Sequence, residues 1–222
     1  MYFGGDHIVW RGFTRSRAAR HRNSRRFRRT GTLMVMQEDI EKVLISAEQV
    51  HTRIKAMALE ITRDFSDIES GITIVPIMTG AMIFTADLIR EMPIRMKINL
   101  MTVSSYPGAS LRTQGVTVLA KQLGDVHGRH VLLIDDILDS GGTLRAVIPL
   151  LKELGADSVR SCVLLRKDRQ TVKGVQADYV GFDIPDEFVV GYGLDYDSVY
   201  RNLRDICTLK PSVYSTNTPN TP

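Results

Sequence analysis

From about residue 46 onward, the chain switches repeatedly between a helical period and short continuous apolar runs. Ser46 and Gln49 form a capping-box pattern, in which the two residues satisfy the first backbone groups of a helix. The apolar residues that follow at helical spacing are Val50, Ile54, Met57, Ile61 and Phe65. This spacing predicts a helix that packs one apolar face against a core.

Short apolar runs rich in β-branched residues predict strands. They occupy residues 71–78, 97–106, 116–122, 130–135, 159–165, 179–182 and 188–190. Further helices are predicted over residues 80–91 and 143–154, and Pro149 is expected to kink the second because its ring crowds the preceding turn. Strands that alternate with helices predict an α/β fold, with a mostly parallel sheet flanked by helices. Such sheets bind ligands at the carboxyl ends of their strands.

Length and composition fit one globular domain with additions at its ends. The chain has 222 residues, of which 43% are hydrophobic and 24% are charged, and this composition excludes a wholly disordered chain. No apolar run reaches the roughly 18–20 residues that a membrane-spanning helix needs. The spacing of Cys162 and Cys207 is not typical of a disulfide framework or a zinc site. We therefore expect two reduced thiols and a cytoplasmic protein that is not integral to a membrane.

The first 33 residues differ from the rest in charge. They hold nine arginines and one acid, whereas the other 189 residues have 20 bases and 24 acids. An arginine-rich, acid-poor segment is typical of a nucleic-acid-binding arm or a targeting peptide. A third interpretation is an upstream start codon, because Met34 and Met36 precede the first periodic segment. We expect a disordered basic extension at 1–33, a folded domain at 34–209 and a disordered tail at 210–222.

Residues 131–144 (VLLIDDILDSGGTL) carry the most informative chemistry. An apolar strand leads to the adjacent carboxylates Asp135 and Asp136, and Asp139 follows three residues later. Residues 140–143 (SGGT) then open a helix, where glycines, hydroxyls and the helix N-terminus can cradle a phosphate. Paired carboxylates suit ribose hydroxyls or a hydrated Mg²⁺, which prefers oxygen ligands. Asp139 beside them can take or donate a proton.

Plainer structural roles exist for the same residues. Asp139 alone would serve as a helix N-cap, and the neighbouring acidic pair as a solvated turn. The ordered succession of strand, acidic pair, Asp-Ser-Gly-Gly-Thr and helix favours a binding site instead. The loop lacks the Gly-Lys-Ser/Thr ending of a Walker A loop. His127 and His130 have no evident third ligand in the sequence, so we assign them no metal site.

This segment resembles the phosphoribosyl-pyrophosphate signature of type I phosphoribosyltransferases. Three further segments resemble the hypoxanthine-guanine branch of that family, namely FTADL at 84–88, SSY at 104–106 and IPDEFVVGYGLDYDSVYRNL at 184–203. The resemblance covers roughly residues 37–208. It implies a type I phosphoribosyltransferase-like fold with a small hood of peripheral strands. It also implies Mg²⁺-dependent transfer of a 5-phosphoribosyl group from phosphoribosyl pyrophosphate to N9 of hypoxanthine or guanine, which gives IMP or GMP and pyrophosphate in purine salvage.

The resemblance implies roles for individual residues. Asp135 and Asp136 would lie at the ribose hydroxyls and, together with Asp195, near the magnesium ion. Asp139 would be the catalytic acid or base at purine N7. The remaining residues implied to bind substrate are Thr79, Gly80, Ser105, Tyr106, Ser140, Gly141, Gly142, Thr143, Lys167, Phe188, Val189 and Arg201.

Each of these roles can be stated more closely. Lys167 would bond the purine 6-oxo group, Phe188 would stack on the base and the backbone of Val189 would read its edge. Arg201 would contact pyrophosphate, and a mobile loop at 105–106 would close over the reacting centre. Each side chain also has a plainer role when it is considered alone. Phe188 and Val189 could be part of a strand core, Lys167 could be a solvated loop charge, and Arg201 could pair with a surface acid. The assignment therefore depends on the wider match to the family.

Thr79 departs from the family pattern, which has a Lys or Arg there on a loop that meets pyrophosphate. The family also has a non-proline cis peptide in this loop, which by position is the Met78–Thr79 bond. The departure keeps a catalytically degenerate paralogue open as a rival interpretation. A second rival is a regulatory RNA-binding relative, which the basic extension would suit. The 184–203 segment favours the purine branch, so we expect phosphoribosyl pyrophosphate, an oxopurine and a second copy of the chain (homodimer or homotetramer) as partners, and no nucleic acid.

Overall fold

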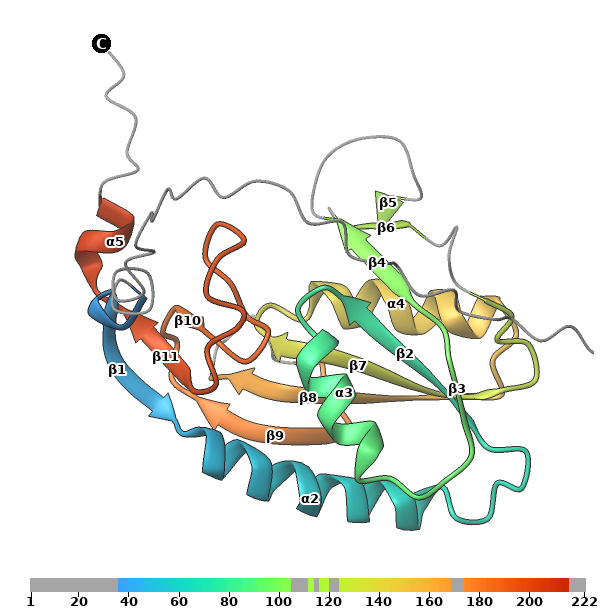
Figure 1. Cartoon of the computed structure of the whole chain (residues 1–222). Helices are drawn as coiled ribbons and strands as arrows, with labels where there is room; N and C mark the ends of the chain where they lie inside the picture. The colour runs from blue at the N-terminus through green and yellow to red at the C-terminus, as the bar shows by residue number, and fades with distance from the viewer. Residues whose placement is uncertain (1–35, 105–111, 114–115, 120–123, 169–173, 216–222) are drawn as a thin grey trace, which may run out of the picture.

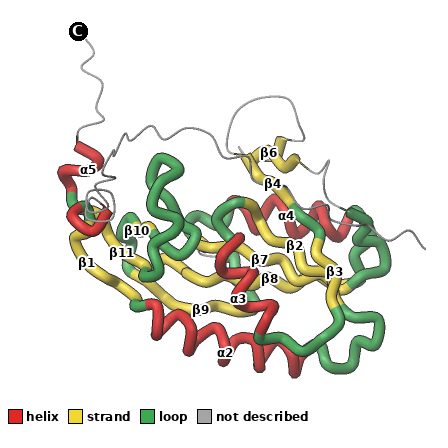
Figure 2. The backbone as a smooth tube through the Cα atoms, viewed as in Figure 1, coloured by secondary structure: helices red, strands yellow, loops and turns green. Residues whose placement is uncertain are grey.

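The computed structural model describes residues 36–104, 112–113, 116–119, 124–168 and 174–215. In these residues, a central sheet carries helices on both faces, and a smaller sheet lies beside one end of its strands (Figure 1). Figure 2 shows the strands of the central sheet as a layer between helices α2 (Ala47–Asp64) and α4 (Gly142–Glu153). The expected α/β fold class is therefore confirmed.

The central sheet is mostly parallel. Its strands in spatial order are β5 (Arg112–Thr113), β6 (Val116–Leu119), β4 (Met101–Ser104), β2 (Ile72–Met78), β7 (His130–Leu138), β8 (Ser158–Lys167) and β9 (Tyr179–Ile184), and β3 (Met96–Ile98) also pairs with β2. The pairs from β2 through β7 and β8 to β9 are parallel, whereas β6 pairs antiparallel with β4 and β5. The carboxyl ends of β2, β7 and β8 therefore share one edge.

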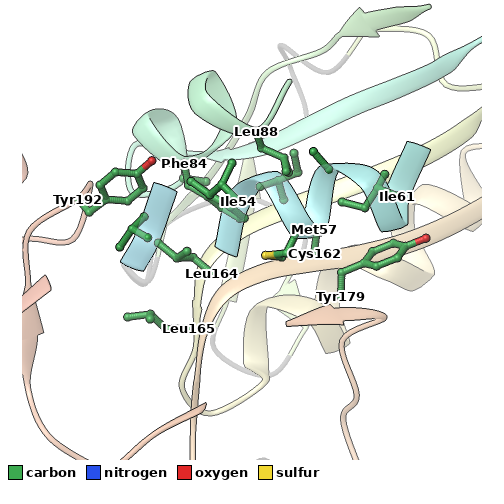
Figure 3. Packing of buried hydrophobic residues seen from close by; sticks show 14 of the residues in the cluster. Ile54, Met57, Ile61, Phe84, Leu88, Cys162, Leu164, Leu165, Tyr179 and Tyr192 are labelled. Carbon is green, nitrogen blue, oxygen red and sulfur yellow. The ribbon is translucent and has the colours of Figure 1, made fainter. Parts of the chain in front are cut away.

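The central strands bury both faces, which explains their continuous apolar runs. In β7, Leu132 and Ile134 join the cluster beneath α2 and α3 (Met82–Arg90), whereas Val131 and Leu133 join the cluster beneath α4. Figure 3 shows side chains of α2 and α3 meeting over the first face, among them Ile54, Met57, Ile61, Phe84 and Leu88. The strand that carries Asp135 and Asp136 is thus fixed from both sides.

Both ends of α2 are tied to the rest of the fold. The predicted capping box is present, because Ser46 Oγ accepts from the backbone N of Gln49 (3.3 Å) and the backbone N of Ser46 donates to Gln49 Oε1 (2.8 Å). At the same end, the backbone N of Ala47 donates to Asp205 Oδ1 (2.7 Å). Asp205 precedes the smaller sheet's strand β11 (Ile206–Leu209), so α2 and that sheet are joined.

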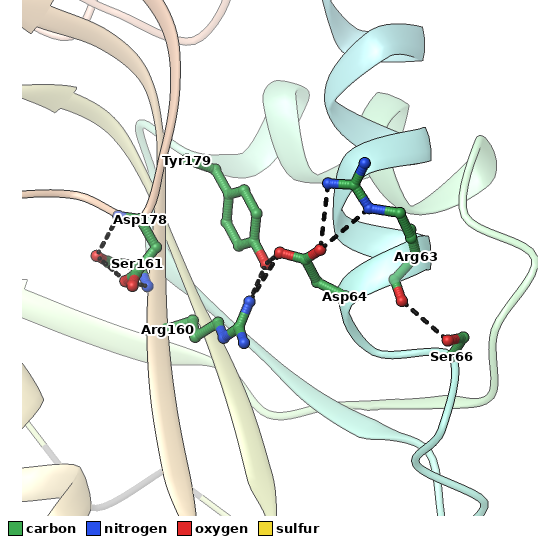
Figure 4. Close-up of polar contacts among 7 residues, drawn as sticks. All are labelled: Arg63, Asp64, Ser66, Arg160, Ser161, Asp178 and Tyr179. Atoms are coloured by element: carbon green, nitrogen blue, oxygen red, sulfur yellow. Dashed lines mark hydrogen bonds and ion pairs between the residues drawn. The ribbon is translucent and has the colours of Figure 1, made fainter.

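The C-terminal end of α2 carries a polar cluster that is drawn in Figure 4. Asp64 Oδ2 accepts from Arg160 Nη1 (2.8 Å) and from the hydroxyl of Tyr179 (3.0 Å). The hydrogen bond from Tyr179 is the main cause that lowers the pKa of Asp64, while burial raises the pKa of Tyr179 to about 12. Arg160 and Tyr179 stand near the starts of β8 and β9, so this cluster pins α2 to the sheet edge opposite the carboxylates.

The smaller sheet, called the hood here, contains β1 (Ile40–Ile45), β11 and β10 (Val189–Val190) in antiparallel order. In Figure 1 it lies beyond the arrowheads of β7 and β8, next to the loop that joins β10 to β11. The hood of peripheral strands expected from the resemblance is therefore present. Neither β1 nor β11 was expected from the sequence pattern.

Several element bounds differ from the expectation. The strand expected at 97–106 is two strands in its described part, because β3 pairs with the start of β2 and β4 with its end, while the backbone N of Asn99 between them donates to Ile74. Strand β7 continues to Leu138, since its pairing with β8 extends to Arg166. Helix α4 begins at Gly142 and continues through Pro149.

The C-terminal segment corrects one prediction. Residues 210–222 were expected to be disordered, but Pro211–Ser215 form helix α5. The backbone N of Val213 donates to Lys210 (2.9 Å), and Val213 packs against the hood. Apolar and aromatic residues within an otherwise polar tail therefore give it a docking face. Among the described residues, no helix is long and apolar enough to cross a membrane.

Candidate active site

The acidic pair lies at the carboxyl end of β7. Asp135 is buried, and its Oδ1 accepts a hydrogen bond from the backbone N of Asp136 (3.0 Å). Burial raises the pKa of Asp135 well above its usual range, and the neighbouring charge of Asp136 raises it further. Burial also raises the pKa of Asp136, against an opposing effect of the Arg201 guanidinium. The charged forms of the pair are thus disfavoured by burial, and an ordered cation would stabilise them.

The loop from Asp139 to Thr143 turns β7 into α4. Gly141 has a φ of 75°, and a Cβ there would lie 2.9 Å from Val175 Cγ2, so the position favours glycine. The backbone N of Gly142 donates to Ser140 Oγ (3.4 Å), and Arg145 Nη1 donates to the carbonyl of Ser140 (2.9 Å). This arrangement places a glycine-containing turn at a helix N-terminus, which suits an anion.

The loop after β2 reaches the acidic pair. The Met78–Thr79 peptide is cis, as the family pattern implied. A Cβ on Gly80 would lie 1.8 Å from Asp136 Oδ2, so a side chain at this position would displace the Asp136 carboxylate. Thr79 itself is exposed. The structure therefore brings Thr79 and Gly80 beside Asp136, although 56 positions separate Gly80 from it in the sequence.

The loop between β10 and β11 completes this side of the site. Gly193 has a φ of 106°, and a Cβ there would lie 2.2 Å from the carbonyl oxygen of Gly80. Arg201 Nη1 donates to the carbonyl of Gly193 (2.6 Å), and Arg201 Nη2 pairs with Asp195 Oδ1 (2.7 Å). Arg201 and Asp195 are thus held over the Gly80 loop and the acidic pair.

Lys167 ends β8 on the other side of Asp139. Its ammonium lies 3.5 Å from Asp139 Oδ1 and 3.5 Å from Asp186 Oδ1, and its side chain is only 7% exposed. A buried cation next to Asp139 can orient an oxo group and stabilise negative charge. Asp186 was missed by the sequence analysis, although the Ile-Pro-Asp turn that carries it stands inside the segment quoted there.

Phe188 and Val189 differ in their exposure to solvent. Val189 is buried in β10, while the ring of Phe188 is 47% exposed. The exposed ring packs edge-on against Tyr196 and Tyr214, two further residues that the sequence analysis did not single out. Ser105 and Tyr106 lie outside the described residues.

The donor set fits a hydrated magnesium ion. The described residues contain no group of three or more His, Cys, Asp or Glu side chains that could hold a metal ion by themselves. Magnesium commonly keeps several waters and takes one or two carboxylates plus substrate oxygens. The buried Asp135–Asp136 pair, whose charged forms are disfavoured without a cation, matches that requirement.

With this geometry in place, the comparisons define the class of protein. The family model for the phosphoribosyl transferase domain matches residues 46–197, and the chain belongs to that family. Hypoxanthine-guanine phosphoribosyltransferases of Mycobacterium tuberculosis and Bacillus subtilis are 42% and 39% identical to it. The first comparison covers 79% of this chain and 89% of the relative, and the second covers 81% and 99%.

Solved structures agree with these relatives. A hypoxanthine phosphoribosyltransferase from Staphylococcus aureus has a TM-score of 0.73 and 38% identity, over 81% of this chain and 97% of that one. The hypoxanthine phosphoribosyltransferase of Trypanosoma cruzi in complex with the product IMP has a TM-score of 0.72 and 35% identity, over 80% of this chain and 98% of that one. The expected hypoxanthine-guanine branch of the family is therefore confirmed.

Proposed function

We propose that the protein transfers the 5-phosphoribosyl group of phosphoribosyl pyrophosphate to N9 of hypoxanthine or guanine, giving IMP or GMP and pyrophosphate in purine salvage. The observation that carries this proposal is the convergence of three features at one sheet edge. They are the buried acidic pair of β7, the anion-binding loop into α4 and the buried Lys167 beside Asp139. Relatives of about 40% identity that bear this activity in their names support it.

The phosphoribosyl group is bound along β7 and α4. The loop formed by Ser140, Gly141, Gly142 and Thr143 holds the 5′-phosphate with its backbone and the N-terminus of α4. Asp135 and Asp136 accept hydrogen bonds from the ribose hydroxyls. They also flank C1, where positive charge develops as the pyrophosphate departs. Gly80 and Arg201 stand where the pyrophosphate leaves, and Thr79 offers it a hydroxyl in place of a cationic side chain.

The base is bound on the opposite side of Asp139. Lys167 donates to the 6-oxo group, Phe188 stacks on the ring and the backbone of Val189 reads its edge. This placement sets N9 toward C1 of the ribose and N7 toward Asp139, which handles the proton there. The buried position of Lys167 strengthens its hydrogen bond to the oxo group.

Asp135, Asp136 and Asp195 are the residues that would hold Mg²⁺. When bound, the ion neutralises charge on the pyrophosphate leaving group. Asp195 is paired with Arg201 and fixed by a hydrogen bond from the backbone N of Ser198 (2.8 Å), so its carboxylate stands ready at the side of the site away from β7.

Further properties follow from the same proposal. Two buried free thiols, Cys162 and Cys207, support a reducing compartment and thus the cytoplasm. A homodimer or homotetramer is the expected assembly, and phosphoribosyl pyrophosphate and an oxopurine are the expected ligands. The extension at 1–33, the folded domain at 34–209 and the absence of a nucleic-acid partner remain predictions.

A turnover assay tests the proposal. The chain is incubated with phosphoribosyl pyrophosphate, magnesium and, in turn, hypoxanthine, guanine, xanthine and adenine, and nucleotide formation is followed. Turnover of hypoxanthine or guanine is expected, together with a loss of activity when magnesium is chelated. Failure with every base would favour the degenerate paralogue, and an RNA mobility shift with and without residues 1–33 would then test the regulatory alternative.

A further inference from the structure

Three aromatic rings from separate parts of the chain meet in the hood. Phe188 precedes β10, Tyr196 lies in the loop between β10 and β11, and Tyr214 lies on α5. The ring centroids are 5.7 Å apart for Phe188 and Tyr196, 6.3 Å for Phe188 and Tyr214, and 6.1 Å for the two tyrosines. The interplanar angles of 87°, 68° and 73° describe edge-to-face packing, which is favourable between aromatic rings.

Tyr214 is anchored independently of Phe188. Its hydroxyl donates to the carbonyl of Leu209 at the end of β11 (2.8 Å). The preceding residue, Val213, packs against the hydrophobic cluster of the hood, and the backbone N of Lys210 donates to Asp39 (2.9 Å). The ring of Tyr214 is therefore held by α5 and β11 and can act as a fixed wall.

The side chain of Phe188 has room to move on this face. Its neighbour Val189 is buried and paired with Thr208, so the backbone is fixed while the Phe188 ring stays 47% exposed. Phe188 and Tyr214 also border a cavity of about 400 Å³, together with residues of β1 and β11. The ring can rotate into this space unless the edges of Tyr196 and Tyr214 restrict it.

We propose that Tyr214 on the C-terminal helix is a positioning residue of the base site, which holds Phe188 in the orientation that stacks on the purine. This inference rests on the proposed function, because it assigns Phe188 to the base. The C-terminal segment thus contributes to base affinity without touching the base. Tyr196 packs edge-to-face against both Phe188 and Tyr214 and so supports the same ring.

The effect should be confined to the base. The groups assigned to the ribose and its 5′-phosphate lie on β7 and in the loop into α4, whereas the ring cluster combines Phe188 before β10, Tyr196 in the β10–β11 loop and Tyr214 on α5. Loss of Tyr214 would release Phe188 and leave the Asp135–Asp136 pair and the 140–143 loop as they are. A general loosening of the hood would instead act through Arg201 and Asp195 and change the KM for phosphoribosyl pyrophosphate as well.

The test compares Tyr214→Ala with Tyr214→Phe and Val213→Ala in the full chain with magnesium. Tyr214→Phe keeps the ring and loses only the hydroxyl, and Val213→Ala loosens α5 without removing a ring. We expect Tyr214→Ala to raise the KM for hypoxanthine by about 2- to 10-fold, the scale of an aromatic pair. The KM for phosphoribosyl pyrophosphate is expected to stay at the parent value. Tyr214→Phe and Val213→Ala keep all three rings and should raise the KM for hypoxanthine by less than Tyr214→Ala does.

The outcomes distinguish a specific role of the Tyr214 ring from a general loosening of the hood. An unchanged KM for hypoxanthine in Tyr214→Ala, or an equal rise in Val213→Ala, would overturn the inference while leaving the proposed function intact. If Tyr214→Ala fails to fold, Tyr214→Leu keeps apolar bulk without a ring and is expected to show the same selective rise. A parent chain that turns over neither hypoxanthine nor guanine would overturn the proposed function, and this inference with it.

Discussion

The proposed phosphoribosyl half and the proposed base half of the candidate site are assembled from the chain in different ways. The phosphoribosyl half is centred on Asp135, Asp136 and the 139–143 loop, which follow one another within nine residues between β7 and α4. The base half combines Lys167 at the end of β8 with Phe188, Val189 and the tyrosines of the hood. The first half is local in sequence, and the second exists only after the hood has docked.

The two halves also depend on different forces. In the phosphoribosyl half, burial raises the pKa of two neighbouring carboxylates, so its chemistry is electrostatic. In the base half, a half-exposed ring is oriented by the edges of two others, so its precision comes from packing. Substitutions in the first half should therefore act on turnover and on phosphoribosyl pyrophosphate, and those in the second on the KM for the base.

Asp139 stands where the halves meet, and its loss should have the largest effect. Asp139→Asn keeps the shape of the side chain but removes its capacity to exchange a proton. We expect turnover to fall by roughly 10²- to 10⁴-fold, the usual scale of general acid–base help. Steady-state turnover with hypoxanthine measures this, and a melting temperature near that of the parent would show that the fold is kept. Parent-like turnover would show that the proton-transfer assignment is wrong.

Thr79 tests the charge of the phosphoribosyl half. Its side chain is exposed beside Gly80 and the acidic pair, so a longer cationic chain has space there. Thr79→Lys adds a charge-assisted contact and should tighten pyrophosphate binding by about 5- to 150-fold, equivalent to about 1–3 kcal/mol. Calorimetric titration of both proteins with pyrophosphate and magnesium is the measurement. A weaker or unchanged affinity would contradict the idea that one cationic contact is missing.

Asp64 lies at the sheet edge opposite both halves and serves as a control for stability alone. Its pKa is lowered mainly by the hydrogen bond from Tyr179, so its contribution to stability is present above the unfolded pKa of about 4 and is lost as pH falls through the lower folded value. We expect Asp64→Asn to lower the melting temperature by a few degrees at pH 7 and progressively less below pH of about 4. Both KM values should stay unchanged.

The melting temperatures of Asp64→Asn at different pH values need a control variant that also loses one acidic side chain. Glu60→Gln removes an acid from the same helix, about one turn before Asp64. A pH-independent destabilisation by Asp64→Asn would contradict the role of its charge. A selective change in either KM would show that the two edges of the sheet are coupled.

Residues 1–33 should have the smallest effect on either half. They contain no apolar periodicity with which to join a core. We expect their removal to leave turnover and both KM values within error of the full chain. A large drop in melting temperature after truncation would show that the basic extension belongs to the folded unit.

Most of the phosphoribosyl half was predictable from the sequence. Continuous apolar runs such as residues 130–135 predicted buried parallel strands because both of their faces are covered. Ser46 and Gln49 predicted the start of α2 because the capping box acts within four residues. The order of strand, acidic pair, glycines and helix likewise described a local structure, so Asp135, Asp136, Asp139 and the 140–143 loop were found in advance as neighbours.

The hood could not be predicted in the same way. Strands β1 and β11 are short and pair with each other across more than 160 positions, so no local pattern announces them. Helix α5 forms in a segment rich in Ser, Thr, Asn and Pro because Val213 and Tyr214 find partners on the hood. Such partners are supplied by tertiary packing, which overrides weak local propensity.

The sequence by itself determined the buried central strands β2, β7 and β8, the chemistry of their carboxyl edge and the family to which the residues point. Only the tertiary structure decided that Gly80 approaches Asp136, that Gly193 packs against Gly80 and that Lys167 lies between Asp139 and Asp186. The physical reason is range. Local features such as helical periods, helix caps and glycine turns act over a few residues. Tertiary contacts join distant segments, which come together only when the core is packed. Here these contacts are close backbone approaches at glycines, buried ion pairs and edge-to-face aromatic rings.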